Sequence, residues 1–232
     1  MKNRIIIALD FDDINQVERL VKQLDPNHCR LKVGMELYNS YGPQIITRLK
    51  DLGFEVFLDL KFYDIPNTVY RACKVCADLG VWMLNVHASG GSKMLEMAHL
   101  AVSEAKHKPL LIGVTVLTSF AKDDLIQTGI TTDLDTQVLN LSKLCFDAKL
   151  DGVVCSAWEA KAIKQHTNNK FLTVTPGIRL TTGQIDDQIR IMTPTNAIKA
   201  GSDYLVIGRP ITQAKDPKEV LESIIEDLKS NL

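Results

Sequence analysis

The chain has 232 residues, is 45% hydrophobic and 24% charged, and carries a formal net charge of -1; this length suits one soluble globular domain over residues 1–232. The near-zero net charge excludes a bulk positive field that would attract nucleic acid. No apolar run approaches the roughly 18 residues of a membrane helix, so neither nucleic acid nor a membrane is an expected partner.

Strand-like and helix-like runs alternate along the whole chain. The strand-like runs are 4–9, 29–33, 55–60, 81–86, 110–116, 152–155, 171–174 and 204–207, and the helix-like runs are 14–24, 44–51, 68–79, 92–105, 137–150, 158–166, 195–200 and 217–228. Such alternation implies a parallel sheet, and eight β/α units predict a closed (β/α)8 TIM barrel, an α/β fold. An open doubly wound sheet is the alternative, but it typically has a Gly-rich turn after its first strand, which this chain lacks.

The N-terminal apolar run is short and ends in the acid Asp10, unlike a secretory signal. A cytoplasmic location is therefore expected. The five cysteines fit this expectation, because the Cys73-x-x-Cys76 pair has no second pair and no nearby His that would complete a zinc or redox site. They are expected to be core or helix-surface thiols, since Cys is among the most buried residue types.

Polar residues gather where the expected strands end. They are Asp10, Lys32, Asp59 with Lys61, Asn85 with His87, Thr115 with Thr118 and Ser119, Ser156, Pro176 with Gly177, and Gly208 with Arg209. The opposite strand ends deliver mainly surface-type residues such as Asn3, His28 and Lys170. Because the carboxyl ends of the strands form the active face of a TIM barrel, this asymmetry predicts a polar functional site there.

The third strand carries the most specific motif, Asp59-x-Lys61-x-x-Asp64. Strand alternation puts Asp59 and Lys61 on one face and apolar residues on the other. Because buried charges are costly, the two side chains are expected in a polar pocket that uses them. Lys32 is expected to join this charge network, although a lysine there can also snorkel to solvent. Asp10 is a candidate site residue whose alternative role is to cap the following helix.

The seventh and eighth strands both end in a glycine close to an arginine: Gly177 with Arg179, and Gly208 with Arg209. TIM barrels often bind phosphate at these two strand ends. Gly208 permits close backbone approach and Arg209 provides a planar fork of donors, although each glycine alone can mark a tight turn. The long segment 180–189 between them is expected to be either disordered or a functional lid, and a lid would bring Gln188 to the phosphate.

These residues resemble orotidine 5'-phosphate decarboxylase of the bacterial type, essentially from end to end. The stretches that carry the resemblance are 8–10, 31–34, 58–68, 85–88, 116–119, 175–179 and 206–210. The resemblance implies that orotidine 5'-phosphate loses CO2 from C6 of its pyrimidine to give uridine 5'-phosphate, the last step of de novo pyrimidine nucleotide synthesis. It implies that no metal and no organic cofactor takes part.

The resemblance also implies the roles of individual residues. Lys61 protonates C6, Asp59 sits beside the substrate carboxylate, and Lys32 helps to hold Lys61 and also contacts the substrate. Asp64 reaches into the other subunit's site, so that the working unit is a homodimer with shared active sites. The remaining implied substrate contacts are Asp10 to a ribose hydroxyl, Thr118 or Ser119 to the pyrimidine amide edge, Arg179, Gln188, Gly208 and Arg209 to the phosphate, and Ile65 and Thr68 elsewhere.

Two other classes of function stay open. One is another phosphosugar barrel enzyme, such as a sugar-phosphate decarboxylase, aldolase or epimerase. These enzymes often use a divalent ion, so activity that survives exhaustive chelation would favour orotidine 5'-phosphate decarboxylase over them. The other is a barrel that binds a nucleotide without catalysis, which has no turnover to lose when Lys61 is replaced.

Overall fold

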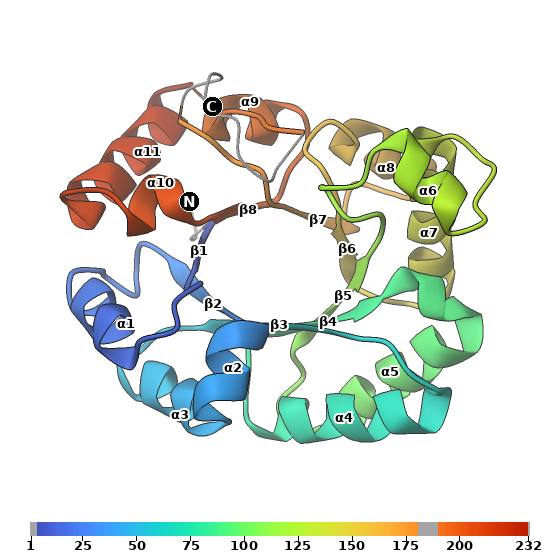
Figure 1. The fold of residues 1–232 in the computed structure, drawn as a ribbon, viewed down its shortest axis with the longest axis horizontal. Coiled ribbons are helices and arrows are strands. Elements are labelled where there is room, and N and C mark those ends of the chain that lie inside the picture. Colours follow the sequence, from blue (N-terminus) through green and yellow to red (C-terminus); the bar gives the residue numbers. More distant parts are fainter. Residues whose placement is uncertain (1–3, 181–189, 232) are drawn as a thin grey trace.

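The computed structural model describes residues 4–180 and 190–231. Eight strands pair in chain order and close into a barrel in which all neighbours are parallel. Figure 1 looks into this ring of strands, with the helices outside it. The expected (β/α)8 barrel is confirmed.

The strands and helices follow one another as expected for β/α units. The strands are β1 (Ile5–Ala8), β2 (Arg30–Gly34), β3 (Val56–Phe62), β4 (Met83–His87), β5 (Leu110–Val114), β6 (Gly152–Val154), β7 (Leu172–Thr175) and β8 (Tyr204–Ile207). The helices are α1 (Ile14–Val21), α2 (Met35–Tyr41), α3 (Gln44–Asp51), α4 (Pro66–Asp78), the 3-10 turn η1 (Ala88–Gly90), α5 (Gly91–Ser103), α6 (Lys122–Gln127), α7 (Leu134–Asp147), α8 (Ala160–His166), α9 (Pro194–Lys199), α10 (Arg209–Thr212) and α11 (Pro217–Asn231). Among these described helices, none is both long and apolar enough to cross a lipid bilayer.

Three short helices, α2, α6 and α10, were not expected from the sequence. The first and last of them bury little: α2 buries Leu37 and α10 buries Ile211. A helix that buries a single residue has no apolar repeat from which its period can be recognised. Both follow directly on a strand and form part of the loops at the carboxyl face.

The core has two layers because neighbouring residues on each strand face opposite sides of the sheet. Ile7 and Leu31 belong to the larger cluster, which packs the outside of the barrel against the helices. Ile6 and Phe57 belong to the smaller cluster, which fills the barrel interior. All five cysteines are buried and unpaired, as expected of core thiols.

The amino-terminal end of the barrel is closed by a buried arginine. Arg30, at the start of β2, is 7% exposed and its Nη2 lies 2.7 Å from Glu55 Oε2. Its guanidinium carbon lies 4.1 Å from the ring centre of Trp82 and 5.4 Å from that of Tyr204. The expectation that this end carries mainly surface-type residues therefore misses a cation that lies against two aromatic rings.

Candidate active site

A cavity of about 730 Å³ opens at the carboxyl ends of the strands. It is lined by most of the residues that the sequence singled out: Asp10, Lys32, Asp59, Lys61, Thr118, Ser119, Arg179, Gly208 and Arg209. These residues come from strand ends or from the loops after them, and the barrel brings them together although they are far apart in the sequence. The location of the cavity agrees with the expected active face.

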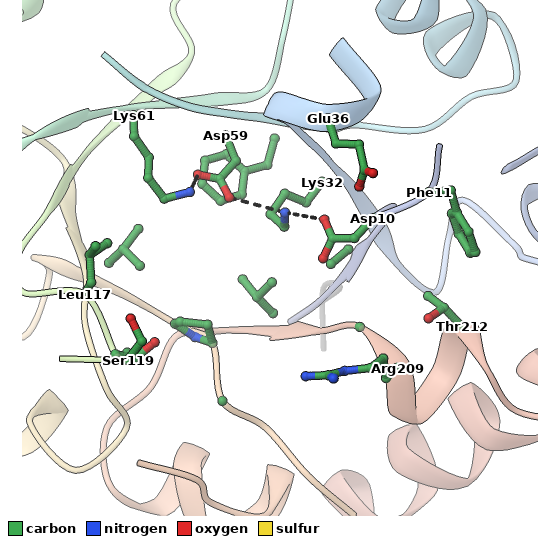
Figure 2. A pocket seen from close by; sticks show the side chains of 18 of the residues that line it. Asp10, Phe11, Lys32, Glu36, Asp59, Lys61, Leu117, Ser119, Arg209 and Thr212 are labelled. Carbon is green, nitrogen blue, oxygen red and sulfur yellow. Dashed lines mark hydrogen bonds and ion pairs between the residues drawn. The ribbon is translucent and has the colours of Figure 1, made fainter. Parts of the chain in front are cut away.

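Four charged side chains stand in a row along one wall of the cavity (Figure 2). Lys61 Nζ lies 2.7 Å from Asp59 Oδ1, and Lys32 Nζ lies 3.3 Å from Asp59 Oδ2 and 3.0 Å from Asp10 Oδ1. The signs alternate, so each buried charge has opposite neighbours. Asp13, not Asp10, caps α1 by accepting from the Asn15 backbone, which leaves the Asp10 carboxylate for the site.

The central pair of this row is buried and remains ionised. Burial alone would raise the pKa of the Asp59 carboxyl, but Lys32, Lys61 and the hydrogen bonds to it outweigh burial and hold its pKa below the usual 3.8. Burial likewise opposes the charge on Lys32, but Asp59 and Asp10 hold its pKa above the usual 10.5. Both groups are therefore charged throughout the range between these two values.

Lys61 reaches the cavity through an irregular backbone rather than by simple strand alternation. Its φ is 53°, in the left-handed region that non-glycine residues rarely adopt. The pairing of β3 with β4 also shifts here, because Leu58 pairs with Leu84 whereas Phe62 pairs with Val86. The expected alternation thus gave the correct side of the strand for Lys61 but missed the bulge that aims it.

Asn85, on β4, connects the two catalytic candidates of β3. Its Nδ2 donates to Asp59 Oδ1 at 2.7 Å, and its Oδ1 accepts from the Lys61 backbone N–H at 2.8 Å. The side chain is 1% exposed. The sequence placed Asn85 among the strand-end polar residues but gave it no role, because its partners depend on the bulge in β3.

His87, at the end of β4, packs near an aromatic ring beside the site. Its ring lies 5.8 Å from the ring of Tyr63, centre to centre. Burial, followed by the nearby charge of Lys61, lowers the pKa of the imidazole below its usual 6.5. His87 is therefore neutral at pH 7. Within residues 4–180 and 190–231, no three His, Cys, Asp or Glu side chains converge as they would around a metal ion.

Arg209 lies on the opposite side of the cavity from the charged row (Figure 2). Gly208 precedes it, and Arg179, which is 5% exposed, lines the same cavity. Gly177 has a φ of 76°, so glycine is required at that turn. Gln188 and the rest of the expected lid, apart from Leu180, lie outside the described residues.

The sequence missed several residues that line the cavity. They are Phe11, Asp12, Gln16, Glu36, Thr212 and Gln213, together with apolar residues of the barrel interior. Glu36 and Thr212 lie on α2 and α10, the short helices that the sequence did not reveal. These two side chains could have been assigned to the site only if the two helices had been recognised in the sequence.

Three candidates from the motif region do not line the cavity formed by the described residues of this chain. Asp64, Ile65 and Thr68 are exposed, and Ile65 keeps 68% of its surface accessible. The Asp64 carboxylate accepts a hydrogen bond of 2.6 Å from the Ile65 backbone. Their expected roles in a partner's site stay a prediction.

The fold and the site together define a (β/α)8-barrel protein with a charged pocket at the end of the barrel where enzymes of this fold carry their active sites. A model of the Orotidine 5'-phosphate decarboxylase / HUMPS family matches residues 3–224. The chain therefore belongs to this family, which confirms the resemblance.

Individual relatives match over nearly the whole chain. An orotidine 5'-phosphate decarboxylase of Legionella pneumophila (strain Corby) is 55% identical over 229 residues, covering 98% of this chain and 100% of the relative. One from Saccharophagus degradans is 54% identical over 225 residues, covering 97% and 94%. The crystal structure of orotidine 5'-phosphate decarboxylase from Lactobacillus acidophilus matches with a TM-score of 0.87 and 38% identity, covering 98% of this chain and 99% of that one.

Proposed function

We propose that this chain converts orotidine 5'-phosphate to uridine 5'-phosphate and CO2 as a carboxy-lyase. The observation that carries the proposal is the alternating row Lys61–Asp59–Lys32–Asp10 on the cavity wall, in which one buried carboxylate is held between two ammonium groups. A substrate carboxylate placed beside Asp59 meets a fixed negative charge, and a carbanion left after CO2 departs meets a fixed positive one.

The proposed step is balanced within the site. The bond between C6 and the carboxylate carbon breaks, its electron pair stays on C6, and a proton from Lys61 Nζ forms the new C6–H bond. The amine left on Lys61 regains a proton from water. Two unit charges of the same sign repel by about 4 kcal/mol at 4 Å and an effective dielectric of 20, and departure of CO2 relieves that repulsion between substrate and Asp59. The proton donor is already hydrogen-bonded in place, so little reorganisation is needed.

We assign the phosphate of the substrate to the opposite side of the cavity. Arg209 offers a planar set of donors there, Gly208 leaves the backbone accessible, and Arg179 adds a second guanidinium to the lining. This group takes no part in bond breaking, but its binding energy positions the pyrimidine against Asp59 and Lys61. Asp10 is the proposed ribose contact, and Thr118 or Ser119 the pyrimidine contact.

We propose further that the active form is a cytoplasmic homodimer with shared sites. Asp64, Ile65 and Thr68 are exposed on one segment after β3, and the neighbouring Tyr63 is 62% exposed. Exposed apolar side chains beside an exposed carboxylate suit a segment that is covered by a second subunit. Five unpaired buried thiols are typical of a reducing compartment.

The test is the ultraviolet absorbance of orotidine 5'-phosphate mixed with the purified protein in excess chelator. We expect the absorbance to change to that of uridine 5'-phosphate, with CO2 released in equal amount. Loss of activity on chelation that is restored by a divalent ion would favour another phosphosugar barrel enzyme. Binding of the nucleotide without turnover would favour a non-catalytic barrel.

A further inference from the structure

The pairing between β3 and β4 is interrupted at the site, and one side chain bridges the interruption. Leu58 pairs with Leu84 and Phe62 pairs with Val86, so that residues 59–61 of β3 face Asn85 alone. Inserted residues at a bulge lose their ladder partners and re-aim side chains. Here the backbone N–H of Lys61 finds its acceptor in the Asn85 side chain, at 2.8 Å.

Both ends of the Asn85 amide are used within the site. The amide nitrogen donates to the Asp59 oxygen that also accepts from Lys61 Nζ, while the amide oxygen holds the Lys61 backbone in its left-handed conformation. A side-chain amide is both donor and acceptor, which this geometry requires. The cavity-lining residues of the described chain include Asp59 and Lys61 but not Asn85, so Asn85 acts through them.

We propose that Asn85 is a positioning residue for the decarboxylation, fixing the Asp59 carboxylate and the Lys61 backbone relative to each other. This inference rests on the proposed function, because it concerns how the proposed proton donor is aimed. A backbone at positive φ persists only when its surroundings hold it. Without the amide, the bulge relaxes and the ammonium leaves the position beside C6.

The charged and titratable groups around Asn85 are few. β3 supplies Asp59 and Lys61, β2 supplies Lys32, and β4 itself supplies His87. β5, which pairs with Asn85 through Ile112, has only apolar or glycine residues from Leu110 to Val114. A new carboxylate at position 85 would face the Asp59 oxygen at hydrogen-bond distance, with the Lys61 ammonium bound to the same oxygen.

This setting makes Asn85→Asp an informative variant. A protonated carboxyl group is close in shape to the amide, with an O–H to donate to Asp59 and a carbonyl to accept from Lys61. An ionised carboxylate loses the donor and repels Asp59. We expect kcat of Asn85→Asp to approach the wild-type value at low pH and to fall as pH rises and the shared proton is lost, whereas wild-type kcat stays level over the same range.

Asn85→Leu removes both hydrogen bonds and keeps the branching and the number of heavy atoms of the side chain. We expect a loss in kcat of about 100-fold, the scale of a misplacement near 1 Å, while KM and the affinity for uridine 5'-phosphate change by less than about threefold. The matched control is Thr173→Val on β7. Thr173 is fully buried and donates to the Gly201 carbonyl at 2.8 Å, at the other end of the barrel. The Thr173→Val substitution should lower Tm and leave kcat unchanged.

The outcomes separate the two proposals. If the wild type does not decarboxylate orotidine 5'-phosphate, the proposed function fails and the role of Asn85 falls with it. If the wild type is active, the role of Asn85 is overturned by an Asn85→Leu kcat within about threefold of wild type, or by an Asn85→Asp pH profile that matches wild type. Should Asn85→Leu fail to fold, the pH profile of Asn85→Asp decides alone.

Discussion

Each end of the barrel contains a buried cation from the same strand, but the surroundings of the two cations differ. β2 places Arg30 at the amino-terminal end and Lys32 two residues further on, at the carboxyl end. Arg30 packs against Trp82 and Tyr204, and its partner Glu55 is at the rim. Lys32 has a carboxylate on either side and opens onto a cavity.

The comparison distinguishes a charge that stabilises the fold, that of Arg30, from charges that are available for a reaction, those of Lys32 and Asp59. At the amino-terminal end, aromatic rings satisfy the cation and fill the space around it. At the carboxyl end, Lys32 and Asp59 are equally buried but face an unfilled volume, so their fields act on whatever enters. Replacements at the carboxyl end should therefore reduce activity, and replacements at the amino-terminal end should reduce stability.

The largest effect is expected for Lys61→Ala. Removing the proton donor should lower kcat by about 10²–10⁴-fold or more, as for loss of a general acid. The affinity for uridine 5'-phosphate should change little, because the phosphate side of the cavity is intact. Steady-state kinetics and equilibrium titration measure the two quantities; equal losses in both would contradict the role as proton donor.

Arg209→Ala should weaken binding of phosphorylated ligands by about 10–100-fold, the worth of a charge-assisted hydrogen bond of roughly 1.5–3 kcal/mol. The affinity for uridine, which lacks the phosphate, is the control and should not change. Isothermal titration with both ligands compares them. An unaltered affinity for uridine 5'-phosphate would refute the phosphate assignment.

A smaller loss of activity is expected for Gly34→Ala. A methyl group at this position would lie 3.2 Å from Lys32 Nζ and 3.5 Å from Asp10 Oδ1. The distance to Lys32 Nζ is shorter than a methyl carbon normally adopts. The ammonium must shift by a few tenths of an ångström, so kcat/KM should fall by about tenfold. Wild-type kcat/KM at an unchanged Tm would show that the position of Lys32 has little influence on the reaction.

Arg30→Leu should leave kcat within about twofold of wild type and lower the free energy of unfolding by about 2 kcal/mol, the scale of a desolvated cation–π contact. Urea unfolding alongside steady-state kinetics measures both. A large loss of kcat at wild-type stability would remove the distinction between the two ends of the barrel.

The sequence was sufficient for the architecture because β/α alternation repeats over the whole chain, and one barrel rule then places all strand ends together. Asp10, Lys32, Asp59 and Arg209 could be found this way. The left-handed backbone of Lys61 could not, because it depends on a register shift between β3 and β4.

The same limit applies to side chains whose roles depend on three-dimensional neighbours. Asn85 acquires its role from the bulge opposite it, and Arg30 acquires its role from rings on β8 and just before β4. Glu36 and Thr212 reach the cavity on helices that bury a single residue each and so show no apolar period. Local patterns thus identify the strand ends, while the contacts between strands decide what each end does.

The most direct measurement is a crystal structure of the protein with uridine 5'-phosphate bound. The account predicts C6 of the pyrimidine within about 3–3.5 Å of Lys61 Nζ, the distance of reacting atoms in a productive complex, with Asp59 beside it and the phosphate at Arg209. A nucleotide bound elsewhere, or Asp59 and Lys61 turned away from it toward solvent, would contradict the account.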